Sequence, residues 1–295
     1  MSDLMAVSTR PDVQLDCRNI LGESPVWDDR EQLLYWVNIH AAELWAWRPG
    51  IAARTVELPE RVGAIGLREQ GGLVLALESG FALLDSLDAE IHTVRRVESP
   101  AHTRMNDGRV DPFGRFLCGG MNEETPQGSN AALYSLSADG RVTKLLDGIG
   151  CTNSLCWSPD GRTMYFSDMP TGRIDAFEYD ARLGAIANRR TFATLKQPGA
   201  PDGSIVDAEG HLWNAQWGGG KLVRYRPDGS VEREVALPVS NPSCVAFGGP
   251  ELDILYVTSA WFTLDDAARA REPHAGSLFA FRPGVRGLPP ERFAG

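Results

Sequence analysis

The sequence predicts an all-β fold, a six-bladed β-propeller with a metal site in its central channel. Short apolar runs, separated by Gly, Pro, Asp and Asn, recur along the 295 residues, and helical periodicity is scarce. One arrangement of strands occurs six times. One position of the repeat carries polar residues in several copies, which predicts the metal site.

The repeated arrangement is clearest in residues 24–47, 153–177 and 203–225. Each copy contains an apolar run, a turn, an apolar strand, a short loop and an alternating strand. Repeats of about 40–50 residues that each hold several strands are typical of β-propellers. A sandwich or barrel is the alternative, but the same order in every copy favours the propeller. The last apolar residue before the first turn of each copy, spaced 40 to 49 residues apart, is Trp27, Leu67, Val110, Trp157, Val206 and Phe247.

Six copies fill the chain, so we expect residues 1–295 to form a single six-bladed domain. Residues 1–12 precede the first copy and are expected to be a flexible N-terminus. One short helix is expected at residues 264–271, inside a longer loop.

The composition excludes several classes of partner. Lys and Arg number 29 against 39 Asp and Glu, a net charge of −10, so we expect neither nucleic acid nor an anionic membrane. No apolar run approaches the roughly 20 residues of a membrane span, and the N-terminus lacks a signal peptide core. The five cysteines contain no Cys-x-x-Cys pair. These features predict a cytoplasmic protein, and a closed propeller needs no partner subunit, so a monomer is expected.

The residue four places before each repeat anchor is polar in most copies. In a propeller the first strands of the blades line the channel, so equivalent positions would converge at one mouth. Asn, Asp and Ser are also common at strand ends, where they bond to local backbone, so any one of them alone could be a turn residue. The six residues are Glu23, Gly63, Asn106, Asn153, Asp202 and Ser243.

Carboxylate and carboxamide oxygens in one register predict a site for a single divalent ion. Such ligands suit Ca²⁺, Mg²⁺ or Mn²⁺; Zn²⁺ or Fe²⁺ is less expected, because no His or Cys shares the register. Arg104 lies two residues before Asn106, on the same strand face, and Glu124 follows the next strand. Arg104 and Glu124 could bind substrate oxygens and hydroxyls, or form a surface salt bridge with each other. Further candidates for the mouth are His40, Asp168 and Trp217.

Several segments together resemble one known family, the senescence marker protein/gluconolactonase family. The resemblance runs through all six repeats, and its specificity comes from the order and spacing of the motifs. It implies a six-bladed propeller with one divalent metal in the central channel. The segments are GESPVW at 22–27, RMNDGRVDPFGRF at 104–116, TNSLCWSPDGRTMYFSD at 152–168, PDGSIVDAEGHLW at 201–213 and FGGPELDILYVTSA at 247–260.

The resemblance also implies roles for individual residues. The metal ligands of the family fall on Glu23, Asn153 and Asp202, and Asp202 would also be the general base. Its substrate contacts fall on Arg104, Asn106 and Glu124. Metal identity varies in the family, so Ca²⁺, Mn²⁺, Mg²⁺, Zn²⁺ and Fe²⁺ all stay open.

The expected activity is therefore hydrolysis of a sugar lactone to the aldonic acid. The metal would polarise the lactone carbonyl and Asp202 would assist the attack of water. Two other functions stay open: a metal-dependent phosphotriesterase or aryl-esterase, and a non-catalytic Ca²⁺-binding propeller. The sugar itself would be selected by loops, of which residues 121–130 and 261–276 are the expected ones.

Overall fold

The computed structural model describes residues 8–97, 100–125 and 128–295. Within them the strands form six sheets. Four sheets consist of four consecutive antiparallel strands, one is completed by β1 (Asp12–Leu15), and one carries β25 (Arg292–Phe293) as a fifth, parallel strand. The chain divides into two compact units, residues 1–58 with 197–290 and residues 59–196 with 291–295. Each unit contains three of the six sheets. The single domain expected over residues 1–295 stays a prediction.

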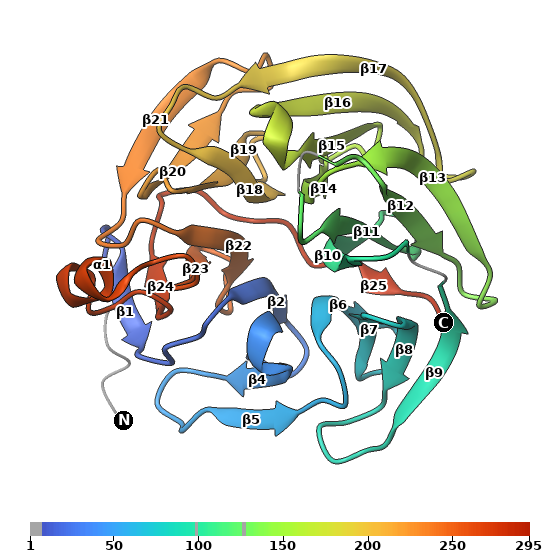
Figure 1. The fold of residues 1–295 in the computed structure, drawn as a ribbon, viewed down its shortest axis with the longest axis horizontal. Coiled ribbons are helices and arrows are strands. Elements are labelled where there is room, and N and C mark those ends of the chain that lie inside the picture. Colours follow the sequence, from blue (N-terminus) through green and yellow to red (C-terminus); the bar gives the residue numbers. More distant parts are fainter. Residues whose placement is uncertain (1–7, 98–99, 126–127) are drawn as a thin grey trace. The chain divides into compact units, whose positions relative to one another are not determined.

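The first unit contains three sheets in which β22 neighbours both β2 and β18 (Figure 1). The outermost strand of the third sheet, β1, comes from the N-terminal part of the chain. The strands are β2 (Gly22–Asp28), β3 (Leu33–Asn38), β4 (Glu43–Trp47) and β5 (Arg54–Glu57); β18 (Ala200–Val206), β19 (Leu212–Trp217), β20 (Lys221–Tyr225) and β21 (Val231–Ala236); and β22 (Pro242–Gly248), β23 (Ile254–Ser259), β24 (Leu278–Phe281) and β1 (Asp12–Leu15).

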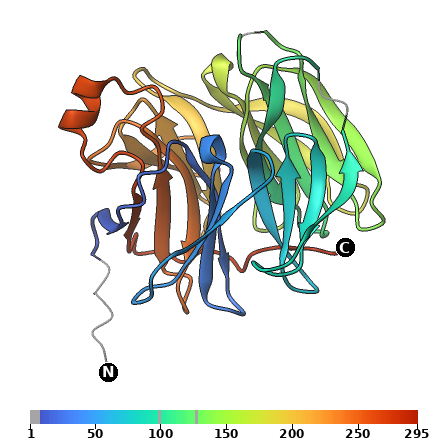
Figure 2. The same ribbon diagram turned by 60° about the horizontal axis from the view of Figure 1, so that its bottom comes forward.

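The second unit repeats this plan, with β10 between β6 and β14. Figure 2 shows strands β6 to β9, in blue to teal, running alongside one another as one sheet. The strands are β6 (Val62–Arg68), β7 (Leu73–Leu77), β8 (Gly80–Leu84) and β9 (Ile91–Arg96); β10 (Thr103–Val110), β11 (Phe116–Asn122), β12 (Ala131–Leu136) and β13 (Val142–Ile149); β14 (Thr152–Trp157), β15 (Thr163–Asp168), β16 (Arg173–Asp180) and β17 (Ala185–Thr194); and β25 (Arg292–Phe293).

The repeat found in the sequence corresponds to one sheet. Every anchor residue, from Trp27 to Phe247, lies at the end of a first strand or one residue before it. These anchors are buried because the first strands are covered on both faces, which explains their nearly continuous apolar runs. Separate apolar clusters lie between adjacent sheets, such as the one that joins Ala64, Phe116 and Phe293 in the second unit. Six repeats therefore give six sheets, as predicted.

The last strand, β25, pairs in parallel with the end of β6. Phe293 is buried in the cluster between the sheets of β6 and β10. The Ala294 N–H donates to the Gly114 carbonyl oxygen at 3.0 Å. Residues 291–295 thus hold together the far ends of two neighbouring sheets.

The helix expected at residues 264–271 is present as α1 (Asp266–Arg271). It begins at Asp266 because the Asp265 carboxylate caps it, accepting from the Ala268 N–H at 2.7 Å. Two short 3₁₀ turns, η1 (Ile39–Ala41) and η2 (Met169–Thr171), follow β3 and β15. Over the described residues, none of the helices has the length and apolar character needed to span a membrane.

The expected flexible N-terminus, residues 1–12, lies partly outside the described residues. Of the remainder, the Ser8 carbonyl oxygen accepts from the Arg282 N–H at 2.8 Å, and Asp12 pairs with Ala280 in the sheet. The loop expected at 121–130 is described except for residues 126 and 127.

Candidate functional site

Each first strand carries an irregularity at the position that the repeat singles out. The register shifts fall at Glu23–Val26 in β2, Val62–Ala64 in β6, Met105–Gly108 in β10, Asn153–Cys156 in β14, Pro201–Ser204 in β18 and Pro242–Val245 in β22. The six residues counted from the sequence lie at or inside these shifts. A β-bulge turns a side chain out of the regular alternation of a strand and is common beside functional sites. The predicted register is therefore a distinct structural position.

The backbone is unusual directly after two of the predicted metal ligands. Ser24, after Glu23, has a φ of 51°, and Ser154, after Asn153, has a φ of 59°. A left-handed conformation costs a residue with a side chain about 1–2 kcal/mol. After Asp202 the equivalent residue is Gly203, where a Cβ would lie 2.2 Å from Cys244 Sγ. Gly203 does not adopt the left-handed conformation; it is glycine because the close approach of Cys244 leaves no room for a side chain.

In the first unit, Glu23 and Asp202 are buried carboxylates near the N-terminal ends of β2 and β18. Glu23 Oε2 accepts from the Ser24 N–H at 3.0 Å. The side-chain amide of Asn214 donates to the Asp202 carbonyl oxygen at 3.0 Å and so holds the bulge of β18 in place. Ser243 has a structural role, because its hydroxyl donates to the carbonyl oxygen of Gly22, the residue before Glu23.

In the second unit, three predicted residues form a hydrogen-bonded series across β10 and β14. Arg104 Nη1 donates to Asn106 Oδ1 at 2.8 Å, and Asn106 Nδ2 donates to Asn153 Oδ1 at 3.3 Å. Asn106 Nδ2 also reaches the Thr152 carbonyl oxygen at 2.8 Å. Arg104 and Asn153 are each 3% exposed. Burial lowers the pKa of the Arg104 guanidinium below its ordinary value.

The predicted Glu124 lies apart from this series, while its neighbour Glu123 joins it. Glu124 pairs with His102 Nδ1 at 3.0 Å, and both side chains are more than half exposed. Glu123 Oε1 instead accepts from Arg104 Nε at 3.2 Å and from Arg61 Nη1 at 2.7 Å. The salt bridge considered between Arg104 and Glu124 is thus formed instead by Arg104 and Glu123, and its arginine is buried.

Sequence reasoning missed Arg61 and Glu123. Arg61 lies two residues before Gly63, as Arg104 lies two residues before Asn106, so the same register count extended by two positions would have found it. Gly63 itself offers no side chain, because a Cβ there would lie 2.4 Å from the Met105 carbonyl group.

The three weaker candidates have local surroundings that explain them. Asp168 Oδ1 accepts from the N–H groups of Gly150 and Cys151, both at 3.0 Å, and so fixes the chain just before β14. His40 packs on Phe262 with ring centroids 4.4 Å apart. Trp217 is half-buried at the end of β19.

The donor set suits a hard cation better than a soft one. Within the part of the chain that the structure describes, no three His, Cys, Asp or Glu side chains gather as a metal-binding group. The predicted ligands are two buried carboxylates and one buried carboxamide, Glu23, Asp202 and Asn153. Buried carboxylates need a cation or several hydrogen bonds, and oxygen-only sets are typical of Ca²⁺ and Mg²⁺. The residues therefore fit the expected divalent ion.

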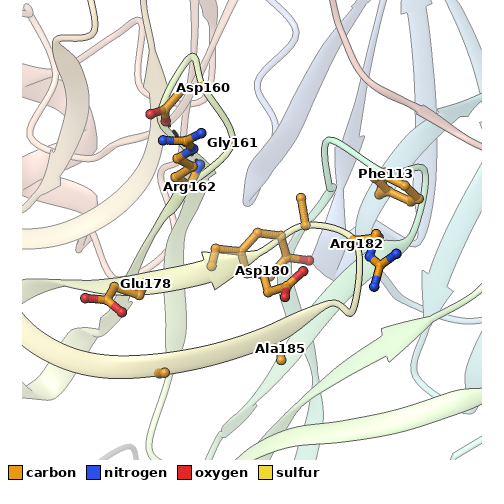
Figure 3. Close-up of a pocket in the computed structure, with 11 residues that line it drawn as sticks. Phe113, Asp160, Gly161, Arg162, Glu178, Asp180, Arg182 and Ala185 are labelled. Atoms are coloured by element: carbon orange, nitrogen blue, oxygen red, sulfur yellow. Dashed lines mark hydrogen bonds between the residues drawn. The ribbon is translucent and has the colours of Figure 1, made fainter.

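A pocket of about 710 Å³ lies at the opposite ends of β10 and β14 (Figure 3). It is bounded by turns that follow these strands, with Phe113 and Gly161, and by the hairpin of Asp180 and Ala185. None of its lining residues belongs to the predicted register. The pocket is thus a surface hollow between turns, remote along each strand from Asn106 and Asn153.

Comparison with known proteins points to the same family as the sequence motifs. The family model described as "SMP-30/Gluconolactonase/LRE-like region" matches residues 21–261. L-arabinolactonase of Azospirillum brasilense is 41% identical over 285 residues, which cover 95% of this chain and 94% of that protein. Regucalcin of Xenopus laevis is 38% identical, with 93% and 95% covered. The crystal structure of a calcium-binding protein, regucalcin, from Agrobacterium tumefaciens matches with a TM-score of 0.91 and 31% identity, covering 99% of this chain and 100% of that one.

These similarities establish first the class of protein, a mostly-β six-bladed β-propeller, as the sequence predicted. They then establish the family. The chain belongs to the SMP-30/gluconolactonase/LRE-like family, as its motifs indicated.

Proposed function

We propose that this chain is a divalent-metal-dependent sugar lactonase, which opens an aldonolactone to the aldonic acid. Family membership and 41% identity to an L-arabinolactonase support a lactonase. The observation that carries the proposal is the series Arg104–Asn106–Asn153. It joins a guanidinium and an amide, which can bind hydroxyl oxygens, to a carboxamide suited to a cation.

Glu23, Asn153 and Asp202 would hold the metal. When bound, a divalent ion supplies Lewis-acid polarisation of the lactone carbonyl oxygen. The oxygen ligands favour Ca²⁺, Mn²⁺ or Mg²⁺ over Zn²⁺ or Fe²⁺.

Asp202 would act as the general base. Its carboxylate takes a proton from the attacking water as the water oxygen bonds to the carbonyl carbon. The bond from that carbon to the ring oxygen then breaks, and the proton returns to the departing alkoxide. Burial of Asp202, which is 4% exposed, limits its contact with bulk water.

Arg104, Asn106 and Glu124 would bind the sugar hydroxyls. Arg104 and Asn106 are already held by hydrogen bonds, so little ordering would be required when the substrate binds. Glu124 is exposed and follows β11, where it can adapt to the substrate.

The test is ring opening of five- and six-membered aldonolactones, followed by proton release, on chelator-treated protein with single metals restored. We expect turnover well above the spontaneous rate, restored by at least one of Ca²⁺, Mn²⁺, Mg²⁺, Zn²⁺ and Fe²⁺. Hydrolysis of a phosphotriester but of no lactone would replace the proposal with the phosphotriesterase function. A metal that raises the melting temperature without any turnover would indicate a structural ion.

A further inference from the structure

In the second unit, two arginines at the N-terminal ends of the neighbouring strands β6 and β10 share one carboxylate. Arg61 directs Nη1 and Nη2 at the two oxygens of Glu123, at 2.7 and 2.9 Å. Arg104 directs Nε at Glu123 Oε1 at 3.2 Å. Because Arg61 precedes β6 and Glu123 follows β11, this carboxylate also links the sheet of β6 to that of β10.

Arg61 is itself held from the other side. Its Nε and Nη2 donate to the two oxygens of Glu78 at 3.0 and 2.6 Å. The backbone supports the same pair, because the Glu78 N–H donates to the Arg61 carbonyl oxygen at 3.0 Å. A guanidinium with two bidentate carboxylate partners has one strongly preferred orientation.

The charges of this cluster explain how Arg104 is kept in place. Arg104 is 3% exposed, and a buried cation needs a paired anion. Burial would raise the pKa of Glu123, but the hydrogen bond from Arg61 and the charge of Arg104 lower it overall, so this glutamate stays ionised. Without the negative charge of Glu123, Arg61 and Arg104 would repel each other across the position it leaves.

We infer that Arg61 and Glu123 are positioning residues, which act through Arg104 to hold Asn106 and the substrate-binding side of the site in place. This inference rests on the proposed function, since that proposal assigns substrate binding to Arg104 and Asn106. Glu123 aligns the Arg104 guanidinium, whose Nη1 then reaches Asn106 Oδ1. Arg61 fixes Glu123 and has its own orientation fixed by Glu78.

The test compares Glu123→Gln, Arg61→Ala and the double variant with the parent protein. We expect Glu123→Gln to raise KM for the preferred lactone about tenfold, the equivalent of one lost hydrogen bond, with kcat changed less than about threefold. Arg61→Ala should raise KM by a smaller factor, about threefold. Both act through Arg104, so the double variant should be no worse than Glu123→Gln alone.

Glu178→Gln is the matched control. The change is the same, but Glu178 is exposed on β16, where it accepts from Asn188 Nδ2 and lies outside the Arg61–Glu123–Arg104 cluster, so KM and kcat should stay at the parental values. A purely structural link between sheets would lower the melting temperature in Glu123→Gln and leave KM unchanged. That result, or multiplicative effects in the double variant, would overturn the inference.

A crystal structure of Glu123→Gln gives a readout that needs no activity. The Arg104 side chain should leave Asn106 Oδ1, and an unchanged Arg104 would overturn the inference. If the parent protein opens no sugar lactone, the proposed function fails, but this structure still decides whether Glu123 positions Arg104.

Discussion

At its N-terminal end, β10 presents Arg104 and Asn106, which bond to each other, and Asn106 also donates to Thr152 and Asn153 of β14. At its far end, the Asp111 carboxylate instead accepts from N–H groups of its own turn, those of Phe113 at 2.9 Å and Arg115 at 2.7 Å. The contacts of Asn106 thus reach a neighbouring sheet, whereas Asp111 bonds mainly within its own turn and adds one contact from the Tyr179 hydroxyl of the neighbouring sheet. Local bonds form as the turn forms, whereas bonds across sheets require the packed structure.

The sheet of β18 in the first unit shows the same contrast with two aspartates. Asp207, in the far turn, accepts from the N–H groups of Glu209 and His211, both at 3.0 Å, and from the side chains of Trp213 and Arg224, both at 2.9 Å. Asp202 lies in the bulge at the other end of β18, where Asn214 holds its backbone. Asp207 is thus built into the sheet and stabilises it, whereas Asp202 lies where the regular hydrogen-bond ladder is interrupted.

Asp202→Asn should have the largest effect on activity. We expect kcat to fall about 10³-fold, because the base is lost while the shape is kept. The melting temperature of the metal-free protein should change little. Lactone turnover and thermal unfolding measure the two effects, and full activity would contradict the assignment of Asp202 as base.

Asp207→Ala changes the aspartate at the other end of β18 and should affect stability instead of activity. We expect the free energy of unfolding to fall by about 3 kcal/mol, since Arg224 loses one of its partners in a buried setting and two N–H groups lose theirs. Urea unfolding measures the loss. Activity per folded molecule should be unchanged, and a fall in kcat as large as that of Asp202→Asn would abolish the distinction between the two ends.

Gly63→Ala tests whether the bulge sets the site. The added Cβ would lie 2.4 Å from the carbonyl carbon and oxygen of Met105, so the backbone beside Asn106 must shift. We expect about 2 kcal/mol of lost stability and a higher KM. Gly50→Ala is the control: its φ is 82° but its surroundings are open, so it should cost about 1 kcal/mol with KM unchanged.

The smallest expected effect is that of mild acid on KM. Hydrogen bonds from Arg61 lower the pKa of Glu78, and Arg61 and Arg104 together lower that of Glu123. Because these pKa values are lowered, both glutamates stay ionised at and above the pH at which an ordinary glutamate is protonated. The ion pairs are lost only as the pH falls through the lower, folded-state pKa values. KM should therefore change less than about twofold between about pH 7 and about pH 5. A steep rise of KM within that window would show that Glu123 is protonated there.

Much of the fold could be predicted because the relevant information is local. The anchors Trp27 to Phe247 end apolar strands and are followed by turn residues, and six such repeats leave few fold classes open. The helix Asp266–Arg271 also has a local cause, since its capping residue Asp265 directly precedes it in the sequence. The register of the site followed from the same counting, because equivalent strand positions in a repeat have equivalent surroundings.

The partners of the site residues could not be predicted in the same way. The sequence gives Glu123 and Glu124 as adjacent carboxylates, and only packing directs one to Arg104 and the other to His102. Arg61 and Arg104 are far apart along the chain and share one carboxylate only because β6 and β10 are neighbours.

The sequence alone was enough to predict the strands, the turns, the sixfold repeat and the polar register, because each depends on residues close together in the chain. Packing in the tertiary structure sets which carboxylate pairs with which guanidinium. Packing also leaves no room for a side chain at Gly63. It also decided that Ser24 and Ser154 adopt left-handed backbone conformations. These features depend on distances of a few ångströms between separate strands, which packing fixes and no local pattern encodes.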